Sequence, residues 1–158
     1  MTRVSRGLVV CLHGLGDTGS GWAFLQNELQ LPTNTFATRP NFLFPTAPTQ
    51  PVTVNGGAKM TSWMDLDAIP LTPDANDHEP SIKASTKIVH DLLDQAVADG
   101  TPADEIVLGG FSQGAALSVY AGYTYSKKLA GIFAISGWPP LADELVEALR
   151  SGANRDTP

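Results

Sequence analysis

The sequence predicts an α/β protein with a mostly parallel sheet and helices on both faces, and three observations support this. Short apolar segments that suit buried strands alternate with longer segments of helical periodicity. Glycine-rich turns follow two of the apolar segments, at residues 14–19 and 109–114. The chain has 158 residues, of which 42% are hydrophobic and 16% charged, and this suits one buried core. We therefore expect a single domain over residues 1–158.

The predicted strands are short apolar runs bounded by glycine or polar residues. The clearest is LVVCL, residues 8–12, which ends just before His13-Gly14. The other three are residues 41–44, 105–109 and 129–135. Ligands of parallel sheets bind at the carboxyl ends of the strands, so the two glycine-rich turns are the candidate functional loops. Residues 129–135 are expected at a sheet edge, where unpaired backbone groups invite aggregation.

Four segments have helical character. Residues 81–99 are the clearest, with Ser81 able to cap the first turn. Its apolar stripe consists of Ile82, Ser85, Val89, Leu92 and Ala96. The other three predicted helices are residues 20–29, 112–125 and 141–149. Residues 45–80 are rich in Pro, Thr, Gly and Asn without a clear period, which predicts a long and functional loop.

The composition excludes several classes of protein. The net charge is −6 and the ten Lys and Arg residues are scattered, so we expect no nucleic-acid partner. The single cysteine, Cys11, cannot form an internal disulfide, and its apolar surroundings indicate a buried, inert thiol. No segment approaches the roughly 18 apolar residues of a membrane span, and the N-terminal run is too short for a signal peptide. We expect a cytoplasmic protein.

GFSQG, residues 110–114, is the most informative motif. It fits G-x-S-x-G between a predicted strand and a predicted helix. A serine on such a turn is held in strained geometry with its hydroxyl exposed, and the glycines allow close packing. The motif predicts that Ser112 is the nucleophile of a serine hydrolase. The alternative is a tight turn whose serine only caps a helix.

A serine esterase also needs two N–H donors for the oxyanion. One belongs to the residue after the nucleophile, here Gln113, and the other to the loop after an earlier strand. HGLGDTGSGW follows the strand at residues 8–12. Gly14, Leu15 or Gly16 could supply the second donor, and we favour Leu15.

The same loop also fits the G-x-G-x-x-G pattern of dinucleotide-binding proteins through Gly14, Gly16 and Gly19. That pattern needs an acidic residue about 20 positions on. Residues 31–64 contain no Asp or Glu, and Asp17 would face the pyrophosphate. A dinucleotide-binding domain is therefore the remote alternative.

Six segments carry a more specific pattern, in order over almost the whole chain. They are HGLGDTGSGW, FPTAP, PVTVNGGAKMTSWMDL, IVLGGFSQGAALSVYA, KLAGIFAISGWPPL and GANRD. Together they resemble the acyl-protein thioesterase/carboxylesterase group of the α/β-hydrolases. The resemblance implies a cytosolic enzyme without a cofactor that often forms a weak homodimer. It implies deacylation of protein thioesters and lysophospholipids and cleavage of short carboxylic esters. It also implies Ser112 as nucleophile and Leu15 and Gln113 as oxyanion-hole donors.

The resemblance also assigns a part of the long loop. Residues 51–66 match a segment that flanks the acyl-binding groove, so Trp63 and Met64 are candidate groove or packing residues. For Trp63, an ordinary place in the core is an equal alternative.

The pattern breaks at the triad, which runs Ser…Asp/Glu…His in α/β-hydrolases. No histidine follows Ser112. His13 is expected to pack and shape its loop, His78 lies in a polar stretch, and His90 is expected to be solvated. Carboxylates do follow the serine, at Asp143, Glu144, Glu147 and Asp156. None of the three histidines is expected to be the general base, and the resemblance places the triad Asp and His after GANRDTP.

We therefore expect an α/β-hydrolase fold that lacks its last strands and helix. The chain alone is expected to be inactive, with the complementary C-terminal fragment as a partner and an acylated protein, small ester or lysolipid as substrate. The alternative is a short form that has lost catalysis and binds acyl chains or a protein partner.

Overall fold

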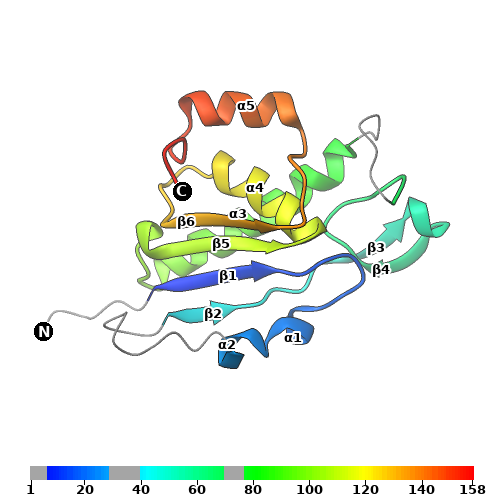
Figure 1. Cartoon of the computed structure of the whole chain (residues 1–158), viewed down its shortest axis with the longest axis horizontal. Coiled ribbons are helices and arrows are strands. Elements are labelled where there is room, and N and C mark those ends of the chain that lie inside the picture. Colours follow the sequence, from blue (N-terminus) through cyan, green and yellow to red (C-terminus); the bar gives the residue numbers. More distant parts are fainter. Residues whose placement is uncertain (1–6, 29–39, 70–76) are drawn as a thin grey trace, which may run out of the picture.

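The fold is built on one parallel sheet. The computed structural model describes residues 7–28, 40–69 and 77–158. Its strands are β1 (Leu8–Leu12), β2 (Asn41–Leu43), β5 (Ile106–Phe111) and β6 (Gly131–Ile135). They lie in the order β2-β1-β5-β6, and every pair is parallel (Figure 1). The four predicted strands are confirmed: β1 has the predicted bounds, and the ends of the other three are shifted by one or two residues.

Five α-helices and two short 3-10 helices accompany this sheet in the described residues. The α-helices are α1 (Gly19–Trp22), α2 (Leu25–Glu28), α3 (Glu79–Ala98), α4 (Gln113–Thr124) and α5 (Ala142–Ser151). The 3-10 helices are η1 (Thr53–Asn55) and η2 (Ala103–Glu105). Each helix is too short or too polar to span a membrane, as far as the described residues go.

Register decides which strand residues meet the helices. Val10, Leu108 and Ile132 are side by side in β1, β5 and β6, so they point to the same face. This face packs against α3 and α4, which lie behind the sheet in Figure 1. Fully buried partners from the two helices are Ile82, Val89, Leu93, Ala116 and Leu117. The apolar stripe predicted for residues 81–99 therefore faces the core.

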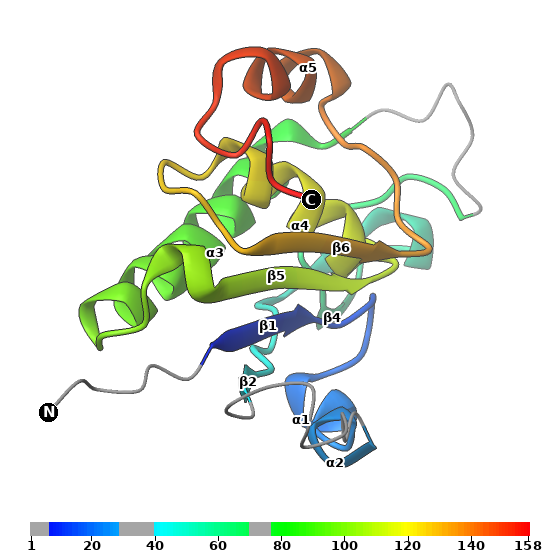
Figure 2. The same cartoon turned by 60° about the vertical axis from the view of Figure 1, so that its left-hand side comes forward.

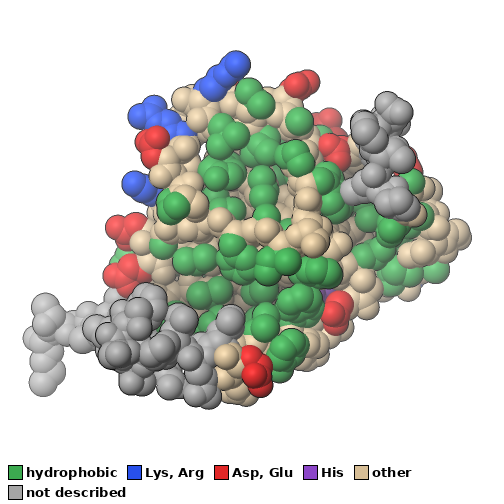
Figure 3. All heavy atoms as spheres, in the orientation of Figure 1, with side chains coloured by type: hydrophobic (Ala, Val, Ile, Leu, Met, Phe, Trp, Pro, Cys, Tyr) green, Lys and Arg blue, Asp and Glu red, His purple; other side chains and the backbone are tan. Residues whose placement is uncertain are grey.

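The opposite face of the sheet carries Val9, Val107 and Phe133, which are half-buried. Helix α1 lies on this side, because its Trp22 ring packs against Phe111 with centroids 5.4 Å apart. Helices thus accompany both faces, as predicted. Figure 3 shows apolar side chains gathered over this face of the sheet.

Cys11 also points to this second face. It is 5% exposed, and its burial raises the pKa of the thiol to about 11. The predicted burial of this residue is confirmed.

Strand β6 lies at the edge of the sheet, as the sequence predicted. Ile135 at its end is 52% exposed. One backbone group on the outer side of β6 is paired, because Ile132 N–H donates to Pro158 O at 2.8 Å. Figure 2 shows the C-terminal segment reaching β6 from α5.

Two predicted segments differ from the structure. Residues 45–80 contain a hairpin of β3 (Thr49–Val52) and β4 (Ala58–Thr61), so the expectation of an irregular loop is wrong there. Residues 70–76 of that stretch lie outside the described part. The helix predicted at residues 20–29 is two short helices interrupted at Ala23-Phe24, and Leu29 is also outside.

Two side-chain expectations on α3 are also wrong. The helix begins at Glu79 with His78 as its N-cap residue, and Ser81 donates its hydroxyl proton to His78 O at 3.0 Å. His90 is half-buried rather than solvated. Its Nε2 donates to Ala121 O at 2.8 Å, and its ring lies 5.2 Å from that of Tyr125. Packing of α3 against α4 accounts for this burial.

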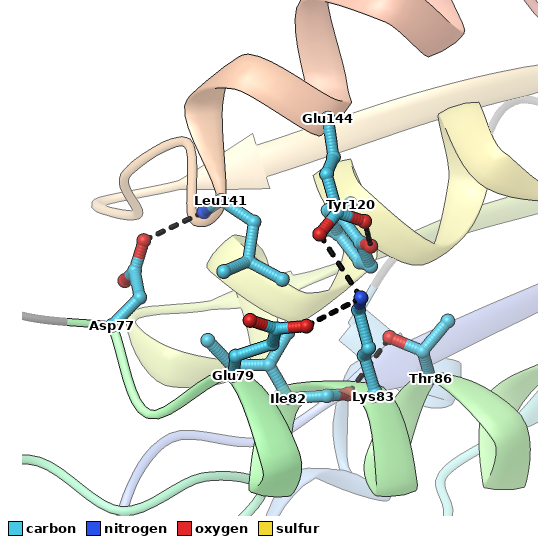
Figure 4. Close-up of polar contacts among 8 residues, drawn as sticks. All are labelled: Asp77, Glu79, Ile82, Lys83, Thr86, Tyr120, Leu141 and Glu144. Carbon is cyan, nitrogen blue, oxygen red and sulfur yellow. Dashed lines mark hydrogen bonds and ion pairs between the residues drawn. The ribbon is translucent and has the colours of Figure 1, made fainter.

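Helix α5 is fastened to α3 and α4 by polar contacts at its N-terminal end (Figure 4). Glu144 accepts from Tyr120 Oη at 2.7 Å and pairs with Lys83 at 3.0 Å. Leu141, in left-handed geometry at φ 49°, donates its N–H to Asp77 at 2.6 Å. The hydrogen bond from Tyr120, followed by the one from Lys83, lowers the pKa of Glu144. Burial and the contact with Glu144 raise the pKa of Tyr120 to about 12.

These contacts predict an acid-sensitive attachment of α5. The folded-state pKa of Glu144 lies below its usual value of 4.5, so its contribution is present above that pH. It is lost as the pH falls through the folded-state pKa. We expect Glu144→Gln to lower the urea midpoint of unfolding at pH 7 and to approach the parent midpoint as the pH falls below the folded-state pKa of Glu144.

Glu147→Gln, on the same helix, is the control and should leave the midpoint near the parent value at pH 7 and in acid. A deficit of Glu144→Gln that persisted unchanged into acid would contradict the assignment.

Candidate active site

The centre of the candidate site is the turn between β5 and α4. Ser112 lies between them with φ 53° and ψ −118°, a backbone geometry that favours glycine. Its N–H donates to Ile135 O at 2.8 Å, and its carbonyl accepts from Ala116 N–H, the first turn of α4. The backbone is thus held in strained geometry from both sides, as the G-x-S-x-G motif predicts.

Gly110 and Gly114 allow this turn to touch the end of β1. A Cβ at Gly110 would lie 2.5 Å from the carbonyl oxygen of Leu12, and one at Gly114 would lie 2.3 Å from the same oxygen. Real Cβ atoms do not approach backbone so closely, so both positions require glycine. The close packing predicted for these two residues is present.

The loop after β1 runs beside Ser112. A Cβ at Gly14 would lie 3.5 Å from Ser112 Cβ, which is ordinary contact distance. Gly16 N–H is already used, because it donates to Thr61 O at 2.8 Å. Leu15 is half-buried against the core, and its N–H donates to no acceptor in the described part of the chain. Of the three candidate donors, Gly14 and Leu15 keep an available N–H.

The buried ring of His13 stabilises the loop after β1. It is fully buried, and its Nε2 accepts from Ala47 N–H at 2.9 Å. The ring proton is therefore on Nδ1, which donates to Gly14 O at 2.6 Å. The predicted role of His13 in packing and loop shape agrees with these contacts.

Asp17 closes the same loop. Its carboxylate accepts from Thr18 N–H at 2.7 Å and from Trp22 Nε1 at 2.8 Å. These hydrogen bonds, the backbone one first, lower the pKa of Asp17. Asp17 is therefore occupied in holding α1 against the loop, which the sequence did not indicate.

The Gln113 side chain has a structural role that the sequence did not predict. It is fully buried and bonds to Ser62, Trp63 and Met64, about 50 residues earlier in the chain. No local pattern in the sequence indicates that residues 62–64 contact residues 110–114, because the two segments are about 50 residues apart. Trp63 and Met64 are 0% and 1% exposed in the hydrophobic core, which favours the packing role over the groove role.

None of the three histidines is bonded to Ser112. His13 and His90 bond to backbone groups, and His78 bonds to Ser81 at 2.8 Å. Among the later carboxylates, Glu144 is engaged by Tyr120 and Lys83, and Asp156 by Arg155. Across residues 7–28, 40–69 and 77–158, no group of three or more His, Cys, Asp or Glu is placed to hold a metal ion.

The backbone strain at Ser112 leads to a test. Glycine tolerates φ 53° and ψ −118° without a Cβ clash, so Ser112→Gly should raise the free energy of unfolding by about 1 kcal/mol. Ser112→Ala keeps the Cβ and should not stabilise the chain. Chemical denaturation of the three proteins measures this, and equal effects of Gly and Ala would show that the strain is absent.

Comparisons with known proteins agree with this geometry. The family model described as Phospholipase/Carboxylesterase matches residues 2–158. Acyl-protein thioesterase 1 of Schizosaccharomyces pombe is 44% identical over 141 residues, which are 89% of this chain and 60% of the relative. Acyl-protein thioesterase 1 of Kluyveromyces lactis is 38% identical over 98% of this chain and 66% of the relative. The chain thus spans 60–66% of the length of these two curated relatives.

Solved structures give the same result. Arabidopsis thaliana SOBER1 superposes with a TM-score of 0.84 at 34% identity, over 91% of this chain and 67% of the other. Zea mays acyl-protein thioesterase 2 gives a TM-score of 0.75 at 32% identity, over 96% of this chain and 65% of the other. The strained serine turn, the order of the parallel strands and these matches lead to one conclusion: the chain belongs to the phospholipase/carboxylesterase family and has an α/β-hydrolase fold.

Proposed function

We propose that the chain carries the nucleophile and the oxyanion hole of a serine hydrolase that cleaves carboxylic esters and thioesters. The observation that supports this most is Ser112 on a strained strand-to-helix turn, beside a loop with an available N–H. The relatives named acyl-protein thioesterase favour acylated proteins as substrates, with small esters or lysolipids as further candidates.

The chemistry follows from the positions of three groups. The substrate carbonyl would lie between the N–H groups of Leu15 and Gln113. Ser112 Oγ attacks the carbonyl carbon while a general base takes its proton. The two N–H groups stabilise the tetrahedral oxyanion, and each lowers the barrier by about 3 kcal/mol. The thiol or alcohol leaves, and water then hydrolyses the acyl-serine.

The general base would come from a polypeptide outside these 158 residues. All three histidines of the sequence bond elsewhere, and serine without a base is a weak nucleophile. The outer side of β6 and the apolar face that Figure 3 shows offer a place for such a polypeptide to pack. On its own, the chain would show little or no turnover.

Complementation tests this proposal. The partner is a polypeptide made from the part of the Schizosaccharomyces pombe relative that this chain does not cover. We expect the chain alone to be inactive towards p-nitrophenyl esters. The mixture should hydrolyse them and become labelled by a fluorophosphonate, and Ser112→Ala should abolish both.

The matched control is Ser118→Ala, which removes a buried hydroxyl from α4 that is bonded to Gly114 O. It should retain labelling wherever it folds. Labelling of Ser112→Ala as strong as that of the parent would refute the nucleophile. Turnover by the chain alone through Ser112 would refute the external base. Binding of a fluorescent fatty acid without labelling in any mixture would favour the non-catalytic alternative.

A further inference from the structure

Both halves of the proposed oxyanion hole are bonded to one short segment, Thr61–Met64. The segment begins at the end of β4 and continues toward α3. It contacts the loop after β1 on one side and the residue after Ser112 on the other. We call these four residues, Thr61, Ser62, Trp63 and Met64, the brace.

On the loop side, the brace makes three hydrogen bonds. Thr61 O accepts from Gly16 N–H at 2.8 Å, and Thr61 Oγ1 donates to Asp17 O at 2.6 Å. Trp63 Nε1 donates to His13 O at 3.0 Å. These contacts lie on both sides of Leu15 in the sequence, so they fix the direction of its N–H.

On the other side, the brace surrounds the Gln113 carboxamide. Its Oε1 accepts from Trp63 N–H at 2.7 Å, and its Nε2 donates to Met64 O at 2.7 Å and to Ser62 Oγ at 3.0 Å. Both N–H donors of the carboxamide and one acceptor position of its oxygen are thus used within the brace. Gln113 is the first residue of α4, so this anchor also orients its backbone N–H.

The brace itself is held firmly. Ser62 and Trp63 are fully buried, and Ser62 Oγ donates to Met64 O at 2.6 Å. Ser85 on α3 donates its hydroxyl proton to Trp63 O. Thr61 pairs with Thr49 in the hairpin. A segment tied to the hairpin and to α3 keeps its shape while the loop and the turn bind to it.

We propose that the brace sets the spacing and direction of the two oxyanion donors. The Thr61 hydroxyl positions the loop that carries Leu15, and the Gln113 carboxamide, bound by the brace, positions the Gln113 N–H. The inference rests on the proposed function, because it concerns the same oxyanion hole. Neither group contacts the substrate, and each acts through a backbone N–H. Displacement by 1 Å can cost on the order of 100-fold in rate, so loss of one anchor should be measurable.

The first experiment is kinetic and uses the complemented enzyme. Thr61→Val keeps the shape and β-branching of Thr61 and removes its hydrogen bond to Asp17. We expect kcat to fall roughly tenfold with KM nearly unchanged, and Thr61→Ser to restore most of the rate. The matched control is Thr49→Val, on the cross-strand partner, whose hydroxyl makes no hydrogen bond within the described residues.

A substrate pair separates positioning from a general loss of structure. A thionoester places sulfur, a poor hydrogen-bond acceptor, where the ester carbonyl oxygen would bind. Thr61→Val should therefore reduce the rate on the oxygen ester more than the rate on the thionoester. The ratio of the oxygen-ester rate to the thionoester rate should fall roughly fivefold. An equal loss on both substrates, or an equal effect of Thr49→Val, would overturn the inference.

The second experiment uses the chain alone and needs no activity. Amide NMR should show that Thr61→Val shifts the Leu15 N–H resonance. Gln113→Met, whose side chain is of similar size, should shift the same resonance, because the brace links the two sites. Thr49→Val should leave the Leu15 N–H resonance unshifted. Unmoved Leu15 resonances in Thr61→Val would overturn the brace even if hydrolysis through Ser112 is established. Shifted resonances in the chain alone, together with no hydrolysis by the complemented mixture, would support the brace geometry and count against the proposed function.

Discussion

The contact between the Ser112 turn and the end of β1 is the constraint on which the rest of the site depends. The β1–β5 register places Leu12 beside Gly110, and the Leu12 carbonyl comes close to both glycines of the turn. Side chains at either glycine would push β1 away from α4. The loop after β1 would then lose its position next to Ser112. A parallel pairing of two strands thus decides whether a nucleophile and an oxyanion donor can meet.

The same sheet order explains why the hairpin is needed. Parallel strands bring their carboxyl ends to one edge, but they leave the loops there without backbone partners of their own. The β3–β4 hairpin and the residues after it supply those partners to the loop at Gly16 and Asp17. The same loop is also held by the His13 ring, which donates to Gly14 O, and by Asp17, which accepts from Trp22 of α1. The Gly16 N–H and the Asp17 carbonyl are thereby bonded, while the Leu15 N–H beside Ser112 donates to no acceptor in the described residues.

Local signals account for the parts of the fold that could be predicted. Strand β1 and the turn at Ser112 were predictable because an apolar run and the G-x-S-x-G spacing lie within a few residues. The hairpin was not, because Pro51 and the Gly56-Gly57 turn, with φ 66° and 80°, interrupt any alternation. The burial of Trp63 depends on partners about 50 residues away, His13 and Gln113, which no local pattern reveals.

Cys11 gives this molecule a built-in reporter. Its thiol is the only one in the chain, it is nearly inaccessible, and its raised pKa of about 11 keeps it protonated at neutral pH. A thiol reagent can modify it only when the structure around β1 opens locally. The rate of modification therefore follows local opening around the strand that supports the oxyanion loop. Native-state thiol exchange would report the local stability of the region around that strand without any substrate.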